Sequence, residues 1–300
     1  MKNHIKFVQE NLVFSNLFVG FCVLSLYKVT EILFMIPSNQ KMSIFVLFSA
    51  VASYNFSRIS ILFSKTIYFS QARKWVSNNK YLFILIIFLS TIVSIYYIIL
   101  LRLINLIIPL VFISFFYSFS FIKILKMIYP NINFSPNIPF YTLSIRNIPL
   151  LKIFLISFSW TYLTVFIPII TNNITFDIYS ISIIIIYFLF ILSITIPFDI
   201  RDLNFDTIIT LPSLFGIKSS KIIAYISLFF CELIILLLYL YNYLFFSVFI
   251  ALLITFEIAS LFIFFTKKDN KELFFSFYIE GLSILMFLGV YIASNFYDTI

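Results

Sequence analysis

Apolar runs of about 20 residues follow one another along almost the whole chain, and they restrict the fold more than any other feature. A run of this length lets an α-helix cross the hydrocarbon core of a bilayer. The chain is 62% hydrophobic and 11% charged, whereas soluble domains are roughly 25% charged. The sequence therefore predicts an all-α, polytopic membrane protein with nine transmembrane helices in one domain covering residues 1–300. The nine runs lie at about 11–36, 42–63, 81–101, 103–126, 149–171, 176–198, 219–240, 243–266 and 273–296.

Basic residues are concentrated on one side of these predicted spans. Seventeen of the twenty Lys and Arg residues lie in the N-terminus or around the connections that follow even-numbered spans. Because cytoplasmic connections carry an excess of Lys and Arg, this predicts a cytoplasmic N-terminus and an external C-terminus. The net charge of +8 then reflects orientation among membrane lipids, and it argues against a nucleic-acid partner. We expect an integral, multi-pass protein of a bacterial inner membrane.

The scarce residue types exclude several kinds of site. The single histidine, His4, precedes the first run, so a histidine-built metal site or catalytic triad is excluded. Cys22 and Cys231 lie within apolar runs, where cysteine usually acts as a small buried hydrophobe. With four glycines and no G-x-x-x-G pattern, close glycine-mediated contacts between helices are not expected.

Three carboxylates, Asp199, Asp202 and Asp206, lie close together in the connection between the sixth and seventh runs. Pro197 precedes them and, lacking an N–H group, is expected to end the sixth helix. If the stretch is helical, the spacing i, i+3, i+7 places all three side chains on one face. Like charges held this close repel, so the pattern predicts a nearby cation. Either a basic side chain such as Arg201 or a hard metal ion such as Mg²⁺ meets this requirement.

The same stretch resembles a known family. Arg201-Asp-Leu-Asn-Phe-Asp206, followed by Thr210-Leu211 and Gly216, resembles the second aspartate motif of the UbiA family of membrane prenyltransferases, in the form found in the menaquinone branch. Upstream, Ser144-Ile-Arg-Asn-Ile-Pro149 is similar to the basic and proline-containing entry to that family's fifth helix. Nine spans and a cytoplasmic N-terminus also fit the family.

The resemblance implies a UbiA-like bundle that transfers a polyprenyl group from its diphosphate to an aromatic or lipophilic acceptor. Asp199, Asp202 and Asp206 would then carry over as one set of Mg²⁺ ligands, and no catalytic residue is assigned. The chemistry needs positive charge because the diphosphate becomes more negative as the allylic C–O bond ionises. Prenyl diphosphate and the acceptor are the partners that the resemblance implies.

One part of the family pattern is missing. The first aspartate motif should stand at the end of the second run, where this chain keeps Asn55 but has no acid between Glu31 and Asp177. Arg58 shares a helix face with Asn55, and its guanidinium could hold phosphate oxygens in place of one Mg²⁺. Alternatively, Arg58 is an interfacial anchor. The candidate substrate-binding residues are Asn55, Arg58, Arg146, Arg201 and Lys218.

Two other functions stay open. The missing motif suits a non-catalytic relative that binds an isoprenoid or a quinone. A proton-coupled transporter of small solutes is suggested by Glu232, Glu257 and Glu280, which fall inside predicted spans where carboxylates are costly and are functional candidates. The alternative for each is a protonated or hydrogen-bonded acid that faces the bundle.

Overall fold

The computed structural model describes residues 11–59, 71–118, 150–203 and 209–295, and every regular element in these ranges is a helix. Two π-helical turns interrupt the α-helices: η4 (Tyr162–Phe166) joins α8 to α9, and η5 (Phe274–Ile279) precedes α13. The α-helices are α2 (Leu17–Leu33), α3 (Gln40–Ser57), α4 (Gln71–Asn78), α5 (Lys80–Leu100), α6 (Ile104–Ser118), α8 (Leu151–Thr161), α9 (Ile167–Thr171), α10 (Ile178–Asp202), α11 (Leu211–Leu240), α12 (Phe246–Phe265) and α13 (Leu282–Asn295).

Six helical segments in the described ranges are long and apolar enough to cross a membrane. They correspond to the third and the fifth to ninth predicted runs. The first, second and fourth runs also form helices, but α2 and α6 have only 17 and 15 residues and α3 contains several polar side chains. The protein is therefore a multi-pass helical membrane protein, whereas nine spans stays a prediction. The six segments are Lys80–Leu100, Leu151–Thr171, Ile178–Asp202, Leu211–Leu240, Phe246–Phe265 and Phe274–Asn295.

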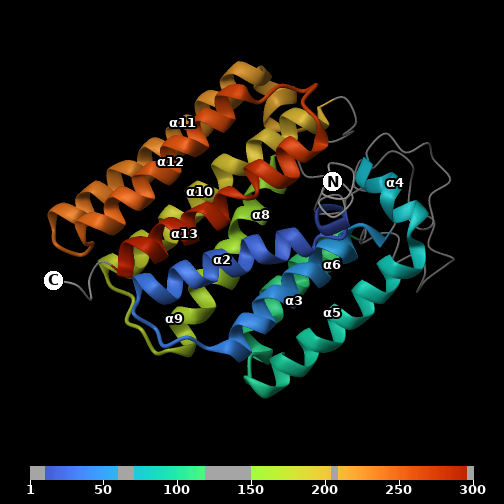
Figure 1. Ribbon diagram of the computed structural model, residues 1–300, viewed down its shortest axis with the longest axis horizontal. Helices are drawn as coiled ribbons and strands as arrows, with labels where there is room; N and C mark the ends of the chain where they lie inside the picture. Colours follow the sequence, from blue (N-terminus) through green and yellow to red (C-terminus); the bar gives the residue numbers. More distant parts are fainter. Residues whose placement is uncertain (1–10, 60–70, 119–149, 204–208, 296–300) are drawn as a thin grey trace, which may run out of the picture.

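The long helices form a closed ring of contacts. α2 packs on α3, which packs on α5 and α6, and the series continues through α8, α10, α11 and α12 to α13, which returns to α2. Figure 1 shows α2 and α13 side by side where the ring closes. There the rings of Phe18 and Phe277 stack with their centroids 4.8 Å apart. Fully buried rings, including Tyr27, Tyr187 and Phe190, fill the interior of the bundle.

α2 and α3 approach each other closely at Gly20. A Cβ added at Gly20 would lie 2.6 Å from Cγ2 of Val51 and 3.1 Å from the Leu47 carbonyl oxygen. The expectation of no glycine-mediated contact is therefore wrong at this position, because one glycine opposite a bulky side chain is enough.

Pro197 does not end α10, contrary to the sequence prediction. The helix continues through it to Asp202. The proline leaves the Ser193 carbonyl without its usual donor, and membrane helices tolerate such a gap where neighbouring helices cover the backbone. Here Ile196, Pro197 and Ile200 are all buried. The aspartates of this stretch that the structure describes therefore sit on a helical turn and not in a loop.

Candidate anion-binding site

Four helices bring charged side chains to one end of the bundle. Arg58 follows the last residue of α3, and Arg201 lies in the last turn of α10. Lys152 lies in the first turn of α8, and Glu280 directly follows η5 at the entry to α13. Because these helices alternate in direction, the ends of α3 and α10 meet the beginnings of α8 and α13. The sequence predicts that this end faces the cytoplasm.

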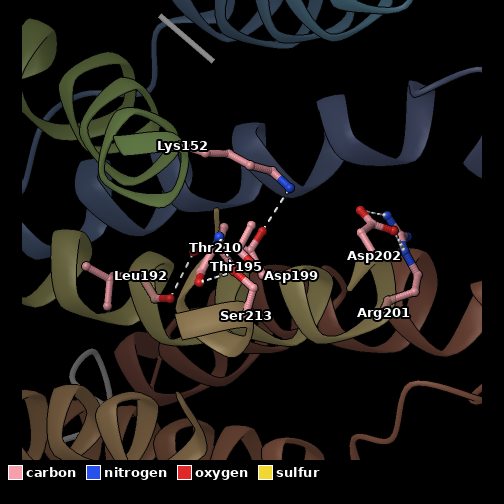
Figure 2. A network of polar contacts seen from close by, with 8 residues as sticks. All are labelled: Lys152, Leu192, Thr195, Asp199, Arg201, Asp202, Thr210 and Ser213. Carbon is pink, nitrogen blue, oxygen red and sulfur yellow. Dashed lines mark hydrogen bonds and ion pairs between the residues drawn. The ribbon is translucent and has the colours of Figure 1, made fainter. Parts of the chain in front are cut away.

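A buried ion pair joins α8 to α10. Lys152 Nζ lies 2.8 Å from Asp199 Oδ1, and the two side chains are 12% and 3% exposed (Figure 2). A cation in the first turn of a helix faces the positive end of the helix dipole, so α8 alone would not favour a lysine there. Asp199 offsets this cost, and Lys152 neutralises a carboxylate that burial would otherwise destabilise.

Arg201 and Asp202 form a second pair further along α10. Arg201 donates from Nε and Nη2 to the two oxygens of Asp202, over 2.7 and 2.9 Å (Figure 2). The guanidinium also lies over the rings of Phe198 and Phe275, at 5.2 and 5.6 Å from their centroids. These contacts fix the plane of the guanidinium and use one edge, and no described residue hydrogen-bonds to its Nη1 atom, which can therefore meet an anion.

Arg58 is the second guanidinium at this end. Its side chain is half-buried, and Nη1 donates to the Phe14 carbonyl oxygen over a long 3.4 Å. It interacts electrostatically with Arg201, which is a repulsion between like charges, and with the carboxylates of Glu272 and Glu280. The structure therefore brings Arg58 and Arg201 into one electrostatic neighbourhood, as an anion site requires.

The fit of Mg²⁺ to this end can be tested on the donor set. Asp199 and Asp202 share α10, but each points to its own basic partner, as Figure 2 shows. Within the described ranges, no group of three His, Cys, Asp or Glu side chains is arranged to hold a metal ion. The two described carboxylates therefore face separate cations, and Mg²⁺ binding by Asp199, Asp202 and Asp206 stays a prediction. Asp206, the third expected ligand, lies outside the described residues.

The other predicted site residues are placed as follows. Asn55 is fully buried; its Oδ1 accepts from Asn16 Nδ2 at 2.8 Å and its Nδ2 donates to the Ser15 carbonyl at 2.9 Å. These bonds tie α3 to the beginning of α2. Lys218 is exposed on α11, two residues after a kink at Gly216, whose φ of 80° suits glycine. Arg146 lies outside the described residues.

Sequence reasoning missed two members of this site. In the sequence, Lys152 is one of seventeen basic residues on the predicted cytoplasmic side, and nothing there distinguishes it from the others. Glu280 was one of three intramembrane acids, and the spacing along the chain does not indicate which side chains face it. The rule that intramembrane carboxylates are functional candidates was the available signal for Glu280.

The three intramembrane glutamates do not act together. Glu232 on α11 interacts electrostatically with Glu257 on α12, and Glu257 is exposed. Glu280 instead interacts with Arg58 and Arg201. The transporter hypothesis gains no support from these contacts.

Two apolar hollows in the described ranges lie away from the charged side chains. One, of about 410 Å³, is lined by α5 and α6 residues such as Ile98 and Phe112. The other, of about 200 Å³, lies between the α8–η4 segment and α10 and is lined by rings including Phe158 and Phe188. Neither is lined by a residue of the candidate site.

Comparisons with known proteins place the fold. No protein-family model matches the chain, and no curated protein is similar in sequence. A solved structure described as a digeranylgeranylglyceryl phosphate synthase in membranes is similar, with a TM-score of 0.51 and 12% identity over 98% of this chain and 99% of that chain. That synthase is a UbiA-type membrane prenyltransferase. This chain therefore shares the helical fold of that membrane synthase, whereas the motif at Arg201–Asp206 stays a prediction.

Proposed function

We propose that this protein binds an isoprenoid diphosphate at the charged end of the bundle and transfers its prenyl group to a lipophilic or aromatic acceptor. The observation that supports this most directly is the convergence of Arg58 and Arg201 from the ends of two different helices. The likeness to a prenyl-transferring synthase agrees with it in fold.

The chemistry that these residues can supply is stabilisation of the leaving group. In prenyl transfer the allylic C–O bond breaks, and the diphosphate leaves with the electron pair. The acceptor then forms a bond to the allylic carbon and loses a proton. Two guanidinium groups held in place before the reaction stabilise the charge that develops on the diphosphate. Phe198 and Phe275 keep one of these groups in position.

The test is binding and turnover with the purified full chain in detergent. Geranylgeranyl diphosphate is added with Mg²⁺ or with EDTA, and its affinity and the release of diphosphate are measured. Arg58→Gln should weaken binding by about tenfold to a hundredfold, since a hydrogen bond to a charged group contributes about 1.5–3 kcal/mol. Lys41→Gln is the matched control, because Lys41 is exposed at the opposite end of the same helix.

The outcomes separate the open alternatives. Release of diphosphate that depends on Arg58 supports the transferase. Binding without release, unchanged by Mg²⁺, favours the non-catalytic relative, which the loss of the first aspartate motif also suits. A strict requirement for Mg²⁺ would restore the metal-binding role expected for Asp199, Asp202 and Asp206. Absence of binding at any Mg²⁺ concentration would overturn the proposal.

A further inference from the structure

Glu280 is a carboxylate at the charged end that the proposed reaction does not use. Its Oε2 atom is buried and has no hydrogen-bond partner in the described ranges. η5 sets its direction: the Glu280 N–H bonds back to the Phe275 carbonyl at 3.2 Å, five residues earlier, which rotates the helix relative to a regular α-helix. A buried unsatisfied carboxylate is costly, so its persistence here needs a physical explanation.

Two guanidinium groups face Glu280 without pairing with it. Arg58 from α3 and Arg201 from α10 both interact with it electrostatically, yet it forms no direct ion pair with a described residue. From α2, the Cys22 thiol is the other titratable group that it affects. From α12, Glu257 is exposed and interacts with Glu232 instead.

Three other acidic side chains described at this end already have partners, and Asp269 is exposed. Asp199 pairs with Lys152, and Asp202 pairs with Arg201. Glu272 accepts the backbone N–H groups of Gln71 and Ala72, at 2.6 and 3.3 Å, at the start of α4. Glu280 is therefore the carboxylate among these four whose partners would change when a ligand arrives.

A diphosphate placed between Arg58 and Arg201 would meet the Glu280 carboxylate as a like charge. The ionised form would repel it, whereas the protonated form would donate a hydrogen bond to a phosphate oxygen. We propose that the ionised form of Glu280 is the counter-ion of Arg58 and Arg201 in the free protein, and that diphosphate binding converts it to the protonated form by uptake of a proton from solution. This inference rests on the proposed function of the same site.

The consequence is a pH dependence that belongs to Glu280. Because the complex holds one more proton than the free protein plus ligand, binding weakens as pH rises through the range in which Glu280 ionises. Glu280→Gln resembles the protonated form in shape and hydrogen bonding but cannot ionise. Its affinity should therefore exceed that of the native protein at high pH and converge with it at low pH.

The experiment measures binding of farnesyl thiodiphosphate, a slowly reacting analogue, to the full chain in detergent with EDTA between pH 6 and pH 9. Titration calorimetry in two buffers of different ionisation enthalpy counts the protons taken up. We expect Glu280→Gln to bind about tenfold more tightly than the native protein at pH 9, with the proton uptake at that pH reduced by nearly one. The ligand's own titration is common to both proteins and cancels in their ratio.

The control is Glu257→Gln, the same substitution at the exposed glutamate of α12, which should leave both the affinity and the proton count unchanged. Parallel pH profiles for the native protein and Glu280→Gln, or weaker binding by the variant at every pH, would overturn the role of Glu280. If instead the native protein binds no diphosphate, or Arg58→Gln binds as well as the native protein, the proposed function itself fails. The two failures are therefore distinguishable.

Discussion

Glu31, near the end of α2, and Glu280, at the beginning of α13, are carboxylates of the same bundle. They differ in whether the described residues supply hydrogen-bond partners to their oxygens. Glu31 is 5% exposed and fully partnered: Lys28 Nζ lies 2.6 Å from Oε2, and the Asn39 N–H donates to Oε1 over 3.0 Å. Glu280 has a buried oxygen with no partner and two guanidinium groups nearby. The first arrangement locks the connection between α2 and α3. The second leaves a buried carboxylate oxygen of Glu280 without a described hydrogen-bond partner, close to two cations.

The largest effect is expected at the charged end itself, from Lys152→Met. This change removes the cation 2.8 Å from the buried Asp199 carboxylate and should lower the free energy of unfolding by about 3 kcal/mol. Thermal or denaturant unfolding in detergent measures the loss. The double variant Lys152→Met with Asp199→Leu removes both charges and should recover most of the stability. An equal loss of stability in the single and the double variant would show that the Lys152–Asp199 ion pair is not the source of the loss.

Glu31→Ala tests whether the two glutamates differ in their contribution to stability. It removes the acceptor of Lys28 and of the Asn39 N–H, so we expect a loss of about 2 kcal/mol. Glu280→Gln should be neutral or stabilising, because it removes a buried charge that has no direct partner. Unfolding of the two variants under the same conditions measures the contrast. A destabilised Glu280→Gln would mean that Glu280 is a structural residue like Glu31.

Gly281→Ala tests whether the turn after η5 directs Glu280. A Cβ at this position would clash with the Phe277 carbonyl oxygen, so the backbone must shift. We expect a loss of about 1–2 kcal/mol in stability together with a changed affinity for diphosphate. Gly289→Ala in α13 is the control, since its Cβ would make an ordinary 3.6 Å contact with Ala251 Cβ and should be tolerated.

Asp177→Ala gives the smallest effect, far from the charged end. Asp177 caps α10, with its Oδ1 accepting the Ser180 N–H at 2.8 Å, and this bond lowers the pKa of the carboxyl below its ordinary value. We expect a loss of about 1 kcal/mol at neutral pH. Because the native pKa is lowered, the contribution is complete above the ordinary pKa and disappears as pH falls through the lowered one. Comparing the native protein with Asp177→Ala by unfolding at neutral and acidic pH checks both statements.

Hydrophobic run length predicts most of the helices. The run at 81–101 became Lys80–Leu100, and the run at 243–266 became Phe246–Phe265, because apolar side chains in lipid require an internally bonded backbone. The predicted end of the sixth helix at Pro197 is wrong, because packing by neighbouring helices outweighs the missing N–H. α11 also departs from its predicted run at 219–240: it begins at Leu211, with Thr210 and Ser213 forming its cap.

The charged end was only partly predictable. The density of acids around Asp199 pointed to a need for cations, and the missing acid near Asn55 pointed to Arg58. The cation that pairs with each carboxylate depends on how α8 and α10 pack, and the spacing of residues along the chain does not determine this packing. Glu280 lies more than two hundred residues from Arg58, so only the closing of the ring brings them together.

That closure has a consequence for biogenesis. The packing face that α2 presents to α13 has no partner until α13 has been synthesised, because α13 follows every other described helix along the chain. The other described helices must therefore remain in the bilayer, or be shielded by an insertase, until α13 is inserted. Glu280 therefore comes near Arg58 in one late step of membrane insertion and not gradually as the polypeptide emerges.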